Sequence, residues 1–375
     1  MADGALPART VTFRRQLLFW LGALVLLIVF LAVFSSILLP FVAGMALAYL
    51  LDPIADWLER RGFNRLLATL TILVLFLVVF IVVLIVLVPL LVEQLAGLIE
   101  RLPELVAQLQ SILQPLIDSD FARNLGINAE SLRGQVGDFV ATGATWLGAI
   151  LGSVLSTGQA LLGIISLIVI TPVVAFYLLY DWDRMTGRVD SWLPRQHAPI
   201  IRDLAGQMNR AIGAFVRGQG LVCLILGAFY AIALTAIGLN FGLLIGLVSG
   251  LLSFIPFVGT IVGFVASVGV AAIQFWPDWG WILATAGIFV VGQFLEGYVL
   301  QPKLIGTSVG LHPVWLMFAL LAFGYLFGFV GTLVAVPVAA IVAVLVRFGL
   351  NTYIASPYYA GAAQVPEEEA EGAGK

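Results

Sequence analysis

An almost unbroken series of Leu, Val and Ile residues runs from 66 to 92, without one charged side chain. A transmembrane helix needs about 20 consecutive apolar residues, because the hydrocarbon core of a bilayer is about 30 Å thick. The rest of the chain is similarly apolar, since 61% of its 375 residues are hydrophobic and 10% are charged, against about 25% charged in soluble domains. So few charges cannot cover the surface of a soluble protein of this size. The sequence therefore predicts an all-α, polytopic integral membrane protein.

About eight transmembrane segments, some short or broken, are predicted. The first, 17–34, follows three arginines, and because no small-residue cleavage site comes after it we expect an uncleaved helix rather than a signal peptide. Segment 37–51 is short for a span and contains Pro40, so we expect the second arm of a tight helical hairpin. The sequence leaves open whether 240–273 and 313–348 cross the bilayer or turn back within it. The other segments are 66–92, 148–180, 216–238 and 281–300.

Residues 93–147 have the pattern of an amphipathic helical insertion. Apolar residues alternate by three and four along one helix face, and the helix can bend at Pro103 and Pro115. We expect this helix to leave the membrane, followed by a loop over 118–128 and a second amphipathic helix over 129–147. The apolar seam either packs these two helices together or joins subunits of an oligomer. It consists of Leu91, Leu95, Leu98, Leu102, Leu105, Leu109, Ile112 and Leu116.

The distribution of arginines predicts the orientation, because cytoplasmic loops carry an excess of Lys and Arg. Arginines gather at the N-terminus, in 52–65 and in 181–217. We therefore expect these segments and both termini in the cytoplasm of a bacterium, with the insertion beyond the inner membrane. The predicted organisation is a group of N-terminal transmembrane helices, the insertion, a transport core and a disordered acidic tail. Their bounds are 1–92, 93–147, 148–348 and 356–375.

The transport core contains an internal repeat. Phe-Val-Gly-Thr-Ile-Val at 257–262 returns as Phe-Val-Gly-Thr-Leu-Val at 329–334, and Gly238-Leu239 returns at the same offset as Gly310-Leu311. A gapped third match relates 216–219 to 290–293, which indicates two units at about 216–285 and 290–348. Substrate sites of transporters often lie between repeats, at broken helices. The candidate break points are Pro256, Gly259, Gly328 and Gly331.

Several motifs in this core are similar to those of a known family. They are Glu-Gly-Tyr-Val-Leu-Gln-Pro-Lys-Leu-Ile-Gly at 296–306, Val-Gly-Leu-His-Pro at 309–313, Gly-Phe-Val-Gly-Thr-Leu-Val-Ala-Val-Pro at 328–337 and Phe-Ile-Pro-Phe-Val-Gly at 254–259. Together they resemble the autoinducer-2 exporter (AI-2E) family, which more often has Asn at the place of Gly297. The resemblance implies an all-helical inner-membrane permease with a periplasmic helical insertion, often oligomeric. It does not fix the cargo, because members are credited with export of a furanone-type signal or with sodium/proton exchange.

Glu296 is the residue from which we expect most about mechanism. It is a lone carboxylate in the apolar span 281–300, followed closely by Pro302 and Lys303. A charge at the centre of a bilayer costs about 2.5–3.5 kcal/mol on insertion scales, so such groups usually face a cavity or a partner. Glu296 is either a proton, cation or gate residue, or a structural group that pairs with Lys303 or extends to the interface. A contact with Lys303 requires the chain to bend at Pro302.

Three further polar residues are candidates for a transport pathway. Lys303 either attracts anionic or hydroxyl-rich cargo or anchors the helix at the interface. Gln219 and Gln293 occupy matching positions of the repeat. They either line a shared polar path or form hydrogen bonds between helices.

The residues usually needed for an enzyme or a metal centre are scarce. Cys223 is the sole cysteine, and His197 and His312 lie far apart in sequence, so we expect no cofactor and no metal site. A net charge of −3 argues against a nucleic-acid partner. The expected partners are the lipid bilayer, a small molecule or ion, and other copies of the chain. We expect a secondary transporter or exporter of a small solute (autoinducer-2-like by the resemblance) or an ion-coupled exchanger, the alternatives being an oligomeric passive channel, a sodium/proton antiporter or a scaffold protein.

Overall fold

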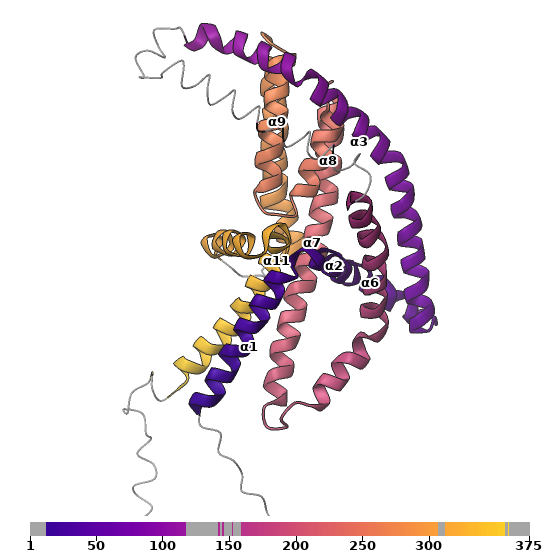
Figure 1. Cartoon of the computed structure of the whole chain (residues 1–375), viewed down its shortest axis with the longest axis vertical. Helices are drawn as coiled ribbons and strands as arrows, with labels where there is room; N and C mark the ends of the chain where they lie inside the picture. Colours follow the sequence, from indigo (N-terminus) through magenta and orange to yellow (C-terminus); the bar gives the residue numbers. More distant parts are fainter. Residues whose placement is uncertain are drawn as a thin grey trace, which may run out of the picture.

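A computed structural model describes residues 13–117, 159–306 and 312–356, together with positions 142, 145, 152 and 359. These residues form helices and connecting turns, with no β-strand among them, as expected for an all-α membrane protein (Figure 1). Segments 118–141 and 360–375, which include the predicted loop and most of the acidic tail, lie outside the described residues. The elements are α1 (Phe13–Val33), α2 (Ser35–Arg60), α3 (Arg65–Ile117), α6 (Gln159–Ser191), α7 (Ala198–Ala236), α8 (Gly242–Leu252), α9 (Val258–Gln274), α10 (Trp279–Phe294), the π-helix η1 (Leu295–Ile305) and α11 (Pro313–Ile354).

In the described part, six helices are long and apolar enough to cross a membrane. They are Ile37–Arg60, Arg65–Arg101, Ser166–Ser191, Ala198–Ala236, Trp279–Ile305 and Pro313–Ile354. Shorter apolar helices include Gly242–Leu252 and Val258–Gln274. The chain is thus a multi-pass membrane protein, although its apolar segments do not all cross as single straight helices.

The connection between α1 and α2 is a bend and not the tight hairpin expected from the shortness of 37–51. Phe34 is the only residue between the two helices, and its N–H donates to the Phe30 carbonyl at 3.0 Å while its own carbonyl accepts from Ile37 at 2.9 Å. Helical hydrogen bonding that continues through Phe34 leaves no loop in which the chain could reverse. The segment is also longer than expected, because α2 continues through Pro40 and Pro53 to Arg60.

The apolar segment 240–273 turns back on itself instead of crossing as one helix. Its first helix, α8, has 11 residues, which extend about 16 Å at 1.5 Å per residue. The chain then turns over residues 253–257 and returns along α9. Gln274, the last residue of α9, joins the end of α9 to the residues that precede α8. Its Oε1 accepts from Asn240 N at 2.7 Å, and its Nε2 donates to the Gly238 carbonyl at 2.7 Å. We call α8, the turn and α9 hairpin 1, and residues 253–257 its tip.

Hairpin 1 lies against α7 through a face of glycines. Gly242, Gly246 and Gly250 follow one another at intervals of four, and a β-carbon added to any of them would overlap the backbone of α7. Small residues at this spacing let two membrane helices approach to backbone contact. Helix α8 therefore packs antiparallel on the second half of α7.

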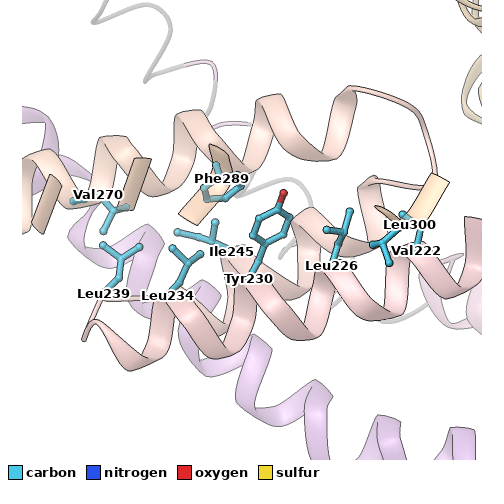
Figure 2. Close-up of a cluster of buried hydrophobic side chains, with 10 residues drawn as sticks. Val222, Leu226, Tyr230, Leu234, Leu239, Ile245, Val270, Phe289 and Leu300 are labelled. Carbon is cyan, nitrogen blue, oxygen red and sulfur yellow. The ribbon is translucent and has the colours of Figure 1, made fainter. Parts of the chain in front are cut away.

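The interior of this region is apolar and continuous. Figure 2 shows Tyr230 of α7 facing Phe289 of α10, and the two rings stack with centroids 4.5 Å apart. Residues from α7, α8, α9 and η1 surround this pair, and the buried members are Val222, Leu226, Leu234, Leu239, Ile245, Val270, Ala271 and Leu300. The core thus binds hairpin 1 to α7, α10 and η1.

Helix α11 is not straight either. Gly328 has φ 62° and ψ −143°, which no helical residue adopts, and the two parts of α11 run in different directions (Figure 1). A β-carbon on Gly331 would overlap the Phe323 carbonyl, and one on Gly324 would lie 2.9 Å from the Thr332 side chain. Residues eight apart in a straight helix are about 12 Å from each other. The chain therefore folds back at Gly328, and we call this the α11 bend.

Helix α3 spans 53 residues, about 80 Å, and carries the first part of the predicted insertion far along its axis. Gln94 Oε1 accepts from the N–H of Leu244 at 3.0 Å, and Gly97 lies beside the ring of Phe241. The first turns of the predicted insertion therefore pack at the start of hairpin 1, a partner that the sequence did not indicate. The side chains of the seam from Leu102 onward, and the helix expected at 129–147, are outside the described residues apart from isolated positions.

Candidate functional site

Glu296 lies in the first turn of η1 and is 4% exposed. It is the one buried carboxylate or cationic side chain among the residues whose burial is described. No ion pair reaches it from any described cation. The burial of this acid without a positive partner makes its surroundings the candidate site.

Two side chains hydrogen-bond to the Glu296 carboxylate. Thr260 Oγ1 donates to Oε2 at 3.5 Å, and Gln301 Nε2 donates to Oε1 at 3.2 Å. Thr260 stands in the first turn of α9, directly after the tip of hairpin 1. Both bonds are long for a charged acceptor, for which N–H···O and O–H···O distances of about 2.5–2.9 Å are usual. The carboxylate is therefore held by two weak hydrogen bonds in the described part of the chain.

The π-helix explains how Gln301 reaches Glu296. In an α-helix, residues five apart point about 140° away from each other. In a π-helix the backbone bonds join residues five apart, so their side chains lie on one face. The Gly306 N–H donates to the Gln301 carbonyl in this pattern at 3.0 Å. Helix geometry thus supplies the second donor to the carboxylate.

Gln219 of α7 holds the tip of hairpin 1. Its side chain is 2% exposed, and Nε2 donates to the Ser253 carbonyl at 2.5 Å. Ser253 Oγ donates in turn to the Ser249 carbonyl at 2.8 Å. A chain reversal inside an apolar core leaves backbone groups without helical partners, and unpaired groups there are costly. The Gln219 amide satisfies one of them.

Cys223 and Tyr230 extend the site along α7. Both lie within electrostatic range of the Glu296 carboxylate. The Tyr230 hydroxyl is buried, packs against Gly292 of α10 and lies near the Thr260 side chain. A buried hydroxyl close to a buried acid can complete its bonding with a water molecule or a bound ligand.

Other residues predicted for the pathway lie elsewhere. Lys303 and Pro302 are exposed on η1, and the π-helix passes through Pro302 without a break. No ion pair joins Lys303 to Glu296 within the described residues. Gln293 is exposed on α10, whereas Gln219 is buried. The two glutamines, although matched in the repeat, therefore lie in different environments.

The four predicted break points divide into two kinds. Pro256 lies in the tip of hairpin 1, and Gly328 is the α11 bend itself. Gly259 and Gly331 each stand just after a break, where a β-carbon would overlap the preceding helix. Both copies of Phe-Val-Gly-Thr therefore occur where a helix restarts after a reversal.

The tip of hairpin 1 lies beside both arms of α11. Phe254 of the tip packs in one apolar cluster with Phe215 and Val216 of α7 and with residues from both parts of α11. The rings of Phe215 and Phe254 meet edge to face at 5.9 Å. Helix α7 thus contacts the tip through Gln219 and both arms of α11 through Phe215 and Val216, one turn earlier.

Sequence reasoning missed Thr260, Gln301, Ser253 and Tyr230. The threonine could have been found, because Thr260 and Thr332 stand at identical positions of the two Phe-Val-Gly-Thr copies. Gln301 gave no such signal, since a spacing of five has meaning only in a π-helix. Ser253 acts through its backbone carbonyl, which any residue would supply.

Comparison with known proteins agrees with this architecture. Residues 21–351 match the family described as AI-2E family transporter. YrrI of Bacillus subtilis, provisionally named a transport protein, is 30% identical over 326 residues, which cover 84% of this chain and 86% of that protein. PerM of Escherichia coli K12, provisionally named a permease, is 29% identical and covers 84% of this chain and 88% of its own. MT0215 of Mycobacterium tuberculosis, also provisionally named a transport protein, is 27% identical over 93% of both chains.

Proposed function

Because this chain belongs to the AI-2E family of transporters, we propose that it is a secondary transporter that moves a small solute in exchange for, or together with, a proton or cation. The site of ion coupling is Glu296. The solute passes beside the tip of hairpin 1, where Thr260 and Gln219 present polar groups inside an apolar protein. An autoinducer-2-like signal is the cargo that the family name favours, and an exchanger of sodium for protons uses the same carboxylate.

The observation that carries this proposal is the state of the Glu296 carboxylate. It is 4% exposed, receives two long hydrogen bonds and has no cationic partner in the described part of the chain. A structural acid in a membrane helix is usually paired, because an uncompensated charge there is expensive. A proton or a cation binds the Glu296 carboxylate and compensates its charge in one step of the transport cycle. The same ion dissociates from the carboxylate in another step.

The location of the acid also favours transport over a purely structural role. Thr260 belongs to hairpin 1 and Gln301 to η1, so the carboxylate joins two elements with different partners. An ion that binds or leaves at this point changes what holds the two elements together. Ion occupancy is thereby linked to the position of the hairpin tip.

A passive oligomeric channel is the alternative, and a flux assay separates the two. Purified protein is reconstituted in proteoliposomes, and uptake of a defined small solute is measured with an imposed proton or sodium gradient and without one. A coupled transporter accumulates solute against its gradient and stops when an ionophore collapses the ion gradient. Uptake that only equilibrates the solute, unaffected by the ionophore, establishes a channel.

We place both termini in the cytoplasm and the protein in the bacterial inner membrane. Arg65 Nε donates to the Leu179 carbonyl at 2.9 Å, which brings the arginine-rich 52–65 segment beside the start of the arginine-rich 181–217 segment. Two such segments at one end favour a common cytoplasmic side. The far end of α3, with the insertion, then lies outside.

We also propose that the chain forms homo-oligomers through the seam beyond Leu98. Charged residues in an apolar seam oppose association, so Leu102→Asp with Leu109→Asp should lower the native mass in mild detergent. Replacing exposed Glu104 by Asp is the control, since it leaves the seam unaltered. An unchanged native mass in the double variant excludes the seam as the subunit contact.

A further inference from the structure

An apolar cavity of about 350 Å³ lies where the N-terminal helices meet hairpin 1. Its walls come from α2, α3, α6 and α7, and Phe254 of the hairpin tip also lines it. Thr171 is the one lining residue with a polar side chain, and its hydroxyl donates to the Pro40 carbonyl at 3.3 Å. The cavity therefore offers no free polar side chain to an occupant.

Water is a poor occupant of such a space. A buried water needs two to four polar partners, and cavities lined by Leu, Ile and Phe stay dry. An engineered cavity of about 150 Å³ already binds benzene. A cavity of this size and lining therefore suits a larger apolar group.

The medium next to the cavity is the hydrocarbon of the bilayer. All four helices in its walls are among those long and apolar enough to cross a membrane. Lining residues alternate in sequence with apolar side chains that are exposed on the surface of the protein. Those exposed neighbours include Phe41, Val79, Val169, Val173 and Leu221.

From this placement we infer that the cavity binds an acyl chain of a membrane phospholipid. The chain enters from the surrounding lipid and packs against Phe80 of α3, Ile168 of α6 and Phe254 of the tip. Apolar surface that is buried on both partners drives the binding. The phospholipid headgroup stays in the interface and takes no part in recognition inside the cavity.

The bound acyl chain contacts the tip of hairpin 1 next to its polar contact with Gln219. Phe254 directly follows Ser253, whose carbonyl accepts from the Gln219 amide. One residue of the tip therefore binds the Gln219 amide, and the next lines the cavity. This inference concerns binding and stands independently of ion coupling at Glu296.

Filling the cavity tests the inference. Gly220 lines the cavity, and a β-carbon there would lie 3.6 Å from Leu50 Cδ1, an ordinary contact. Gly220→Leu therefore places its branched end in the space that the acyl chain occupies. Gly287→Leu on α10 is the matched control, because nothing lies within 4 Å of its added β-carbon. Ala43→Phe fills the same cavity from α2, in case the first variant does not fold.

The probe is phosphatidylglycerol with a diazirine at the end of one acyl chain, mixed into vesicles of phosphatidylethanolamine and phosphatidylglycerol that contain the whole protein. After irradiation, labelled peptides are identified by mass spectrometry. We expect strong labelling at Phe80, Ile168 and Phe254 in the wild type and in Gly287→Leu. In Gly220→Leu that labelling should fall by about tenfold, the change produced by about 1.4 kcal/mol of lost binding. Labelling spread evenly over the exposed apolar residues, or equal at the cavity in Gly220→Leu, overturns the inference.

Discussion

Replacing Glu296 by Gln should abolish ion-coupled transport and leave the fold intact. The amide keeps the size and shape of the side chain. Its oxygen can still accept from Gln301, and its NH₂ group can donate to the Thr260 hydroxyl, which rotates to accept. Both contacts of the wild type, at 3.2 and 3.5 Å, therefore retain a partner. The variant loses the negative charge and little else.

The expected effect on stability is small. Hydrogen bonds to a charged group contribute about 1.5–3 kcal/mol and neutral ones about 0.5–1.5 kcal/mol, and two long bonds fall at the low end of each range. The weaker hydrogen bonds of the variant therefore cost about 1 kcal/mol of stability. This loss is offset because the variant holds no charge at membrane depth, which costs about 2.5–3.5 kcal/mol. Glu296→Gln should thus be as stable as the wild type or more stable. Glu296→Ala, by contrast, removes the acceptor of two half-buried donors and leaves a gap in the core, so it should be less stable than Glu296→Gln.

The assay is gradient-driven flux in proteoliposomes at several pH values, normalised to folded protein, with thermal unfolding in detergent measured in parallel. Transport by Glu296→Gln should fall at least about tenfold, equivalent to about 1.4 kcal/mol in the barrier. Glu296→Asp keeps the charge on a shorter side chain and should retain part of the activity with a displaced pH profile. Glu93→Gln is the control, since Glu93 is an exposed acid on α3. Wild-type flux with unchanged pH dependence in Glu296→Gln would remove Glu296 from the mechanism, and low yield with normal flux per folded molecule would make it structural.

Three further predictions concern the hairpin, the fold and the topology. Gln219→Met should lower stability by about 1–3 kcal/mol in a detergent melt, because the Ser253 carbonyl loses its donor. Gln293→Met, at an exposed position, should have no effect on stability. Equal losses in the two variants would contradict the different environments of the two glutamines. Arg65→Ala should destabilise the protein by about 2 kcal/mol, since the half-buried guanidinium bridges three carboxylates of α2 to the α6 backbone, and an unchanged melt would show that the cluster is fully screened. In a cysteine-free background, Gly126→Cys should react with an impermeant thiol reagent on spheroplasts and Gly187→Cys should not, and the reverse pattern would invert the topology.

The sequence predicted the class of protein because lipid leaves few alternatives to helices. Long apolar segments and scarce charges are direct consequences of a hydrocarbon solvent, so an all-α membrane protein followed from composition and length. The motifs around Glu296 and Gly328 predicted the family, which the match over residues 21–351 confirms. The deep burial of Glu296 without Lys303 needed the structure, because seven residues along a chain do not fix a distance when a π-helix intervenes.

The reversal inside 240–273 could not be derived from hydrophobicity. A hairpin buried in apolar surroundings and a single span both consist of apolar residues, so the pattern is the same. One signal was present, namely glycines at 242, 246 and 250, whose spacing of four creates a flat helix face for close packing. It indicates a helix laid against another helix but not which one. The different fates of Gln219 and Gln293 had no signal at all, because only tertiary packing buries one and exposes the other.

The glycine face of α8 also limits how this protein can move. Its backbone meets that of α7 with no side chain between them. Separating the two helices would expose backbone that is now in close contact, so we expect them to stay together when the protein changes shape. Hairpin 1 and α7 are therefore expected to move as one rigid body, and the hydrogen bond of Gln94 connects helix α3 to it. In the described part of the chain, Phe34 and Gly328 are joints at which the direction of a helix changes. We therefore expect conformational change to occur by rotation at Phe34 and Gly328, while hairpin 1 and α7 keep their mutual contacts.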